Sequence, residues 1–332
     1  METDVKTDHV PDAPVLVEIY RRVALIHQND ARVRSSLKSG KIAASYYSPR
    51  GQEIVPAAVS VSLSDDDYIV TNYRGIHDQI AKGIPLKPLW AEYAGRVTGT
   101  CKGKGGPMHI THPETGVMVT TGVVGSGLPI ANGLALGSQI LGDGRVTVCY
   151  FGDGATNIGA FHEALNMASV WKLPVIFVCQ NNLYAEHTAF AIGTSALRVA
   201  DRAIGYQMPG ITVNGNDPCA MWYAAKTAID RARAGNGPSL IEAMTFRFLG
   251  HAMGDSGHYI PKEEMQAALV ADPVPALRAY LINARYADEA TLSAMEAVIG
   301  RSIDEAVEFA LMSEYPAEIE LARDIYAEES IT

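Results

Sequence analysis

The tripeptide Gly-Asp-Gly occurs twice in residues 141–157, once on each side of an apolar run. That run, residues 145–151, is short and rich in β-branched and aromatic side chains, which predicts a strand. Asp143 precedes the strand, so its copy is expected to be a turn that ends a helix at Gly142. Asp153 follows the strand, and parallel sheets bind ligands at the carboxyl ends of their strands. We therefore expect a functional carboxylate at Asp153 and only a turn at Asp143.

A second pair of polar side chains follows the next predicted strand. Residues 174–180 form another apolar run that leads into Asn181 and Asn182, and residues 160–172 before it have helical spacing. A right-handed crossover makes the two strands parallel and puts their carboxyl ends at one edge of the sheet. Asp153 and Asn182 are therefore expected to lie close together. Their oxygens, with phosphate oxygens, are ligands that complete a magnesium site, and the small residues after Asp153 suit a diphosphate at a helix N-terminus.

A parallel sheet with helices on both faces is needed to position these groups. Four short apolar runs with little alternation are predicted to be central strands, at residues 145–151, 174–180, 210–215 and 238–246. Helical segments separate them, so the expected fold class is α/β, a parallel central sheet flanked by helices, with helical N- and C-terminal extensions. The expected parts are a helical N-terminal extension (1–40), an α/β domain (41–260) and a helical C-terminal region (261–332) that packs on the same domain or on a partner.

The composition excludes several classes of protein. The 332 residues carry a net charge of −10 without a long Lys/Arg run, so no nucleic-acid partner is expected. The four cysteines are far apart and include no CxxC pair, which is typical of reduced thiols in a cytoplasmic protein. No signal-peptide core is present at the N-terminus, and the most apolar stretch, residues 123–141, is broken by Gly, Ser, Pro and Asn. We predict a buried helix of small residues there and no membrane span.

The order Gly-Asp-Gly, helix, strand, Asn-Asn resembles the thiamine-diphosphate binding signature. The likeness covers about residues 48–272, through GQE, TNYRG, CKGKGGPMH, TGVVGSGLPIANG, FGDGATNIGAFHEALNMASVWKLPVIFVCQNNLYA, VNGND and FRFLGHAMGD. The chain is similar to the alpha subunit of the thiamine-diphosphate-dependent first component of 2-oxo-acid dehydrogenase complexes, which include pyruvate, branched-chain and acetoin dehydrogenases. The resemblance implies the thiamine-diphosphate-binding fold, with this chain supplying the domain that holds the diphosphate.

The resemblance also implies which residues bind the metal and the diphosphate. It assigns magnesium to Asp153, Asn182 and the backbone carbonyl of Tyr184. It places Gly154 and Ala155 at the diphosphate.

Three further segments match the family at cofactor-binding positions. Tyr73 and Arg74 match a pair that contacts the diphosphate, and a guanidinium suits phosphate geometry. Gly122 and Val124 match the segment that holds the aminopyrimidine ring. His251 matches the active-site histidine, which lies over the diphosphate near the reacting centre.

Four other positions bear on function. Lys104 and His109 fit the family pattern, and both alternatives stay open for them, lining the site or shaping the loop. Members regulated by phosphorylation have Ser directly after the active-site histidine, where this chain has Ala252, so we expect no such control. Pyruvate-type members often have a second histidine where this chain has Leu249, and the GHAMGD form is closer to the acetoin-type bacterial branch.

The resemblance implies partners as well. No second α/β domain is present to supply the glutamate that activates the cofactor, so a beta subunit is expected in an α2β2 heterotetramer, with the small-residue helix near 125–142 as a contact. The expected reaction cleaves a 2-oxo acid or acetoin and passes the acyl group to a lipoyl-bearing acyltransferase. Two alternatives stay open: half of a split transketolase-like enzyme that transfers ketol groups, and a non-catalytic scaffold subunit. The sequence does not select the substrate among pyruvate, acetoin and branched-chain 2-oxo acids.

Overall fold

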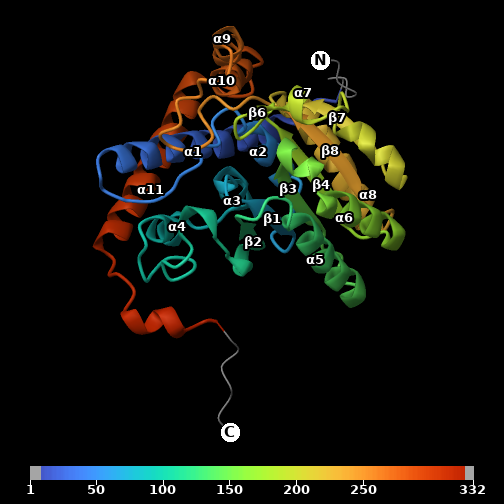
Figure 1. Ribbon diagram of the computed structural model, residues 1–332. Coiled ribbons are helices and arrows are strands. Elements are labelled where there is room, and N and C mark those ends of the chain that lie inside the picture. Colours follow the sequence, from blue (N-terminus) through green and yellow to red (C-terminus); the bar gives the residue numbers. More distant parts are fainter. Residues whose placement is uncertain (1–8, 326–332) are drawn as a thin grey trace.

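Six parallel strands form the central sheet in the order β2-β1-β3-β4-β8-β7 (Figure 1). The computed structural model describes residues 9–325, so residues 1–8 of the expected N-terminal extension and residues 326–332 of the C-terminal region lie outside the described part. The sheet strands are β1 (Tyr68–Asn72), β2 (Val117–Thr121), β3 (Thr147–Gly152), β4 (Val175–Asn181), β7 (Gly210–Asn214) and β8 (Ser239–Met244). The predicted α/β class with a parallel sheet is confirmed.

Four of the six strands match the predicted runs, and two were not predicted. Both missed strands, β1 and β2, have only five residues. β2 lies at the edge of the sheet, inside the segment 93–122, which is rich in Gly, Thr and Pro. A separate antiparallel pair, β5 (Tyr184–Ala185) and β6 (Thr188–Ala189), follows β4.

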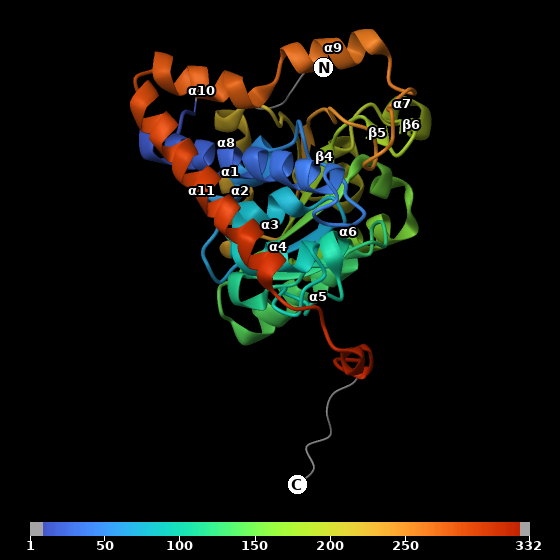
Figure 2. The same ribbon diagram turned by 90° about the vertical axis from the view of Figure 1, so that its left-hand side faces the viewer.

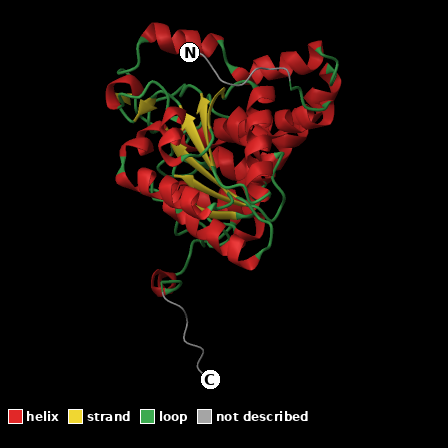
Figure 3. Ribbon diagram, turned by 90° about the vertical axis from the view of Figure 1, so that its right-hand side faces the viewer, coloured by secondary structure: helices red, strands yellow, loops and turns green. Residues whose placement is uncertain are grey.

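Helices cover both faces of the sheet (Figure 3). One hydrophobic cluster joins alternate strand residues such as Val148 and Tyr150 to helices of the first face, and a second joins Cys149 and Phe151 to those of the other face. The first face carries α1 (Ala13–Lys38), α2 (Ile54–Ser60), α3 (Ile76–Lys82), α4 (Leu86–Tyr93), α8 (Pro218–Arg233), α10 (Pro273–Asn283) and α11 (Glu289–Met312). The second carries α5 (Gly127–Leu141) and α6 (Gly159–Trp171). The remaining α-helices are α7 (Phe190–Gly193) and α9 (Lys262–Val270).

The long terminal helices pack on the first face. α11 crosses α1 and continues to α4, as Figure 2 shows. α11 is amphipathic as predicted, because Leu292, Ile299 and Ile303 recur at helical spacing and are buried. Its N-terminus is capped by Asp288, whose carboxylate accepts the Thr291 N–H.

α5 is buried on one face only, which corrects the prediction of a buried helix. Leu128, Ala131 and Ala135 face the sheet, whereas Ile140 and Leu141 are 76% and 74% exposed. The prediction failed because the helix is apolar all round, and within residues 9–325 nothing covers its outer side. In the described part of the chain, no helix is both long and apolar enough to cross a membrane.

The first Gly-Asp-Gly copy is a turn, as predicted. Gly142 ends α5 in the left-handed conformation with φ 65°, and Gly144 also has a positive φ of 75°. Asp143 accepts the Arg145 N–H at 3.0 Å, so its carboxylate serves the turn itself.

Asp67 links the amino ends of two strands to the end of α8, and its loss is expected to destabilise the fold. The fully buried carboxylate accepts the Val146 N–H at 2.9 Å and an Arg233 N–H at 2.6 Å. Asp67→Ala is expected to lower the free energy of unfolding by about 2 to 3 kcal/mol, because it removes charge-assisted hydrogen bonds. Asp230→Ala, which removes an exposed ion pair with Lys226, should cost less than about 0.5 kcal/mol. Urea denaturation measures both, and equal losses would contradict the assignment.

Candidate active site

A cavity of about 260 Å³ opens at the carboxyl edge of the sheet. Nine residues predicted for the site line it: Tyr73, Arg74, Val124, Asp153, Gly154, Ala155, Asn182, Tyr184 and His251. Five lining residues with polar side chains were not predicted: Gln52, Asn72, Gln180, Glu186 and Arg247. Gly122 is not among the lining residues; it lies beside His109, whose Cε1 is 3.1 Å from where a Cβ on Gly122 would be.

Five of the lining segments each follow the carboxyl end of a different strand. Val124 follows β2, Arg74 follows β1, Asp153 follows β3, Asn182 follows β4, and Arg247 follows β8. Because all these strands are parallel, the five segments leave the sheet at the same edge. The site is therefore assembled by the topology of the sheet from segments far apart in the sequence.

Asp153 and Asn182 lie together because β3 and β4 are in register. Gly152 pairs with Gln180, so the next residues of both strands leave the sheet side by side. The two side chains are buried. Burial raises the pKa of Asp153 to about 6. A buried carboxylate of this kind is well suited to a cation, which would compensate its charge.

The segment after Asp153 is a tight turn rather than the start of an α-helix. Residues Asp153–Asn157 form a 3-10 helix, and α6 begins only at Gly159. A Cβ on Gly154 would lie 2.6 Å from the Ala185 Cβ, so a larger residue would displace the β5 segment. The close approach keeps the backbone next to the cavity free of side chains.

Two buried arginines face the cavity without a carboxylate partner. Arg74 donates to the carbonyl oxygens of Ser48 and His251, each at 2.9 Å. Arg247 donates to the carbonyls of Tyr184 at 3.1 Å and Glu186 at 2.8 Å. Within residues 9–325, no carboxylate lies within salt-bridge distance of either guanidinium.

The electrostatics of the two arginines favour an anion in the cavity. Burial and the neighbouring Arg247 lower the pKa of Arg74 to about 10. Uncompensated buried cations are costly, and an anionic group provides the missing partner. Arg247 was not predicted from the sequence, although an arginine directly after the apolar run 238–246 is a signal that could have indicated it.

His251 lies in an aromatic cluster at the same cavity. Its ring is 5.2 Å from the ring of Tyr47 and 5.8 Å from that of Tyr73, both edge to face. Its loop is held by Asp255, which accepts the His251 N–H at 2.6 Å and the Tyr259 hydroxyl at 2.8 Å. Burial, Arg74 and Arg247 lower the pKa of His251 to about 4, so the imidazole is neutral near pH 7.

Lys104 and His109 line a second cavity of about 610 Å³ and do not line the first. Lys104 pairs with Asp324 at 2.7 Å. Glu92 organises their loop by accepting four backbone N–H groups, those of Cys101, Gly103, Gly105 and Gly106. For Lys104 the contacts favour a role in shaping the loop.

Comparison with known proteins places the chain in one family. The family model for the dehydrogenase E1 component matches residues 21–318. The alpha subunit of acetoin:2,6-dichlorophenolindophenol oxidoreductase from Bacillus subtilis is 41% identical over 309 residues, 93% of this chain and 92% of that protein. The alpha subunit of the pyruvate dehydrogenase E1 component from Porphyra purpurea is 37% identical over 285 residues, 84% of this chain and 83% of that protein.

A second acetoin relative extends the match along the chain. The alpha subunit of the Cupriavidus necator acetoin:2,6-dichlorophenolindophenol oxidoreductase is 35% identical over 316 residues, 95% of each chain. The resemblance predicted from the sequence motifs is therefore confirmed. With its cavity at the carboxyl edge of a parallel sheet, the chain belongs to the dehydrogenase E1 component family.

Proposed function

We propose that this chain anchors the diphosphate and magnesium of thiamine diphosphate in an enzyme that cleaves a 2-oxo acid or acetoin. The observation that carries the proposal is the cavity in which Asp153 and Asn182 lie at adjacent strand ends and two buried arginines have no carboxylate partner. Membership of the dehydrogenase E1 component family implies thiamine diphosphate and an oxidoreductase that acts on an oxo group. No finding favours the split transketolase or the scaffold alternative.

The donor set fits a magnesium diphosphate. Asp153 and Asn182 would supply a carboxylate and an amide oxygen, and Tyr184 a backbone carbonyl, which are the hard oxygen ligands that magnesium prefers. Arg74 and Arg247 would neutralise the phosphate oxygens. Thiamine diphosphate supplies the carbanion chemistry, while the protein binds it, orients it and excludes water.

We assign His251 a catalytic position at the diphosphate. The neutral ring has one donor and one acceptor nitrogen at the cavity. An anion beside it would raise its pKa, because opposite charge stabilises the imidazolium. His251 can therefore hold a proton at the site when the diphosphate is present and lose it when the site is free of anions.

A beta-type subunit is proposed to complete the site. α5 and α6 expose apolar side chains on their outer face, including Ile140, Val170 and Trp171. Val124 at the cavity is itself 47% exposed, so a partner that covers this face would also close the aminopyrimidine end. The α2β2 assembly and the transfer of the acyl group to a lipoyl-bearing acyltransferase are part of this proposal.

Both acetoin and pyruvate stay candidates for the substrate. Relatives named for each are 41% and 37% identical to the chain. Ala252 after His251 has no hydroxyl to phosphorylate, so that form of control is not expected.

Removing the proposed metal ligand is expected to abolish cofactor binding. Asp153→Ala leaves magnesium without its only charged protein ligand, so calorimetry of the complex with its beta-type partner should detect no magnesium-dependent binding of thiamine diphosphate. Asp143→Ala is the matched control, because it changes the turn copy of the same tripeptide and should bind nearly as wild type. Undiminished binding by Asp153→Ala, or equal losses in both variants, would contradict the assignment.

Arg74 is expected to be required for tight binding of a diphosphate. Magnesium pyrophosphate should raise the melting temperature of the wild-type complex, because a ligand that binds the native state stabilises it. Arg74→Met should bind pyrophosphate at least about tenfold more weakly, since a hydrogen bond to a charged group contributes about 1.5 to 3 kcal/mol. Arg21→Met, which removes an exposed arginine paired with Glu18, should keep the full thermal shift. A full shift in Arg74→Met would overturn the role.

His251 is expected to titrate far below an ordinary histidine in the anion-free protein. The pKa of His251 is about 4 in the folded chain, whereas in the unfolded chain it has the ordinary value of 6.5. Stability should therefore fall as the pH drops from 6.5 toward 4, and His251→Gln should lack this part of the loss. NMR of labelled histidines measures the midpoint, assigned with His251→Gln. Pyrophosphate should raise the midpoint, and a value at or above 6.5 without anions would contradict the assignment.

A further inference from the structure

The side chain of Gln52 is a buried amide at the cavity, and its oxygen and its nitrogen differ in their hydrogen bonding. It is 1% exposed and lines the same cavity as Asp153 and Asn182. Its Oε1 accepts a hydrogen bond from the Asn182 Nδ2 at 3.2 Å. Its Nε2 is buried and has no hydrogen-bond partner among residues 9–325. Amide nitrogens buried in proteins are nearly always paired, so this donor calls for an acceptor from outside the chain.

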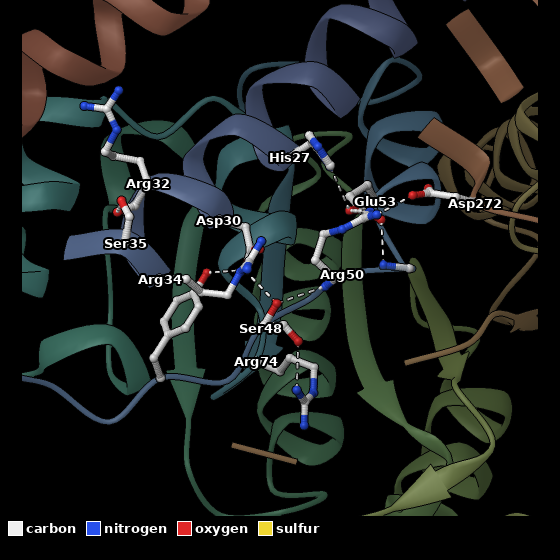
Figure 4. Close-up of polar contacts among 12 residues, drawn as sticks. His27, Asp30, Arg32, Arg34, Ser35, Ser48, Arg50, Glu53, Arg74 and Asp272 are labelled. Atoms are coloured by element: carbon white, nitrogen blue, oxygen red, sulfur yellow. Dashed lines mark hydrogen bonds and ion pairs between the residues drawn. The ribbon is translucent and has the colours of Figure 1, made fainter. Parts of the chain in front are cut away.

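The loop that carries Gln52 is fixed, so the unpaired nitrogen does not result from a loose segment. Figure 4 shows Arg50 between Glu53 and Asp272, with which it forms buried ion pairs. Glu53 also accepts the Gly51 N–H at 2.8 Å. Although burial raises the pKa of Glu53, the neighbouring His27 and Arg50 side chains lower it overall, so Glu53 is held as the carboxylate.

Gly51 fixes the backbone directly before Gln52. It has a φ of 93°, and a Cβ there would lie 2.0 Å from the Phe246 carbonyl oxygen. The same loop presents the Ser48 carbonyl to Arg74, as drawn in Figure 4. The loop therefore positions an arginine and an amide at one cavity from a single rigid frame.

We infer that Gln52 anchors the cofactor by two contacts of one amide. Its Nε2 donates to an oxygen of the diphosphate, and its Oε1 holds Asn182 so that the Asn182 Oδ1 is the atom left for the cation. This inference rests on the proposed function. The Asn182 Oδ1 already accepts the Tyr184 N–H at 3.2 Å and has a second lone pair to offer.

Two substitutions separate the two contacts. Gln52→Glu keeps an oxygen near Asn182 but replaces the donor with a second, negatively charged oxygen. Gln52→Met removes both the donor and the acceptor at nearly constant volume. Gln79→Met is the matched control, because Gln79 is fully buried, donates to Thr120 at 2.8 Å and has an unpaired Oε1, but does not line the cavity.

Binding of magnesium pyrophosphate to the complex with its beta-type partner, measured by calorimetry, tests the inference without relying on activity. Both Gln52 variants should bind at least about tenfold more weakly than wild type, a factor that corresponds to about 1.4 kcal/mol. Gln79→Met should bind as wild type even if its melting temperature is lower. The magnesium concentration for half-maximal binding should rise more in Gln52→Met than in Gln52→Glu, because only the first releases Asn182.

Two results of the same measurements would overturn the inference. Wild-type affinity in Gln52→Glu, which is isosteric with glutamine, would mean that a water molecule pairs with Nε2 and would overturn the inference, even if Gln52→Met fails to assemble. If Gln79→Met weakens pyrophosphate binding as much as Gln52→Met does, the effect comes from the loss of a buried amide in the core, and the inference is overturned as well. Asp153→Ala separates a failure of the proposed function from a failure of this inference. If Asp153→Ala binds pyrophosphate normally, the proposed function fails. If Asp153→Ala loses binding while both Gln52 variants bind as wild type, only the inference about Gln52 fails.

Discussion

The parallel pairing of β3 with β4 is the constraint on which the site depends. Their register matches Gly152 with Gln180, and the chain leaves both strands at the same level. This brings a carboxylate and an amide to adjacent positions although a whole helix separates them in the sequence. A slip of one residue would turn the side chains of β4 to opposite faces and would break both the core and the site.

The cavity keeps an imbalance of charge that the fold alone does not resolve. Arg74 and Arg247 are buried on backbone carbonyls, His251 is kept neutral beside them, and Asp153 is a buried carboxylate at the same cavity. By contrast, Arg50 is buried between two carboxylates, those of Glu53 and Asp272. This contrast supports the proposal that the cavity binds a ligand carrying both phosphate and metal.

Rigidity around the cavity comes from the segments that approach it from outside the sheet. The loop before α2 is held by the Arg50 ion pairs, and the loop after β8 is held by Asp255. Each of these loops delivers a carbonyl to Arg74, from Ser48 and from His251. A guanidinium held at two points has little conformational freedom left to lose when it binds a ligand.

The sequence by itself determined the α/β class, four of the six strands and the different positions of Asp143 and Asp153, one in a turn before β3 and the other at its carboxyl end. It could do so because apolar runs, turn glycines and the direction of a strand are local patterns. The tertiary structure alone decided the positions of β1 and β2, the one-sided burial of α5 and the presence of Gln52 and Arg247 in the cavity. Short strands have a weak periodic signal, and whether a buried polar group has a partner depends on segments that only the folded chain brings together.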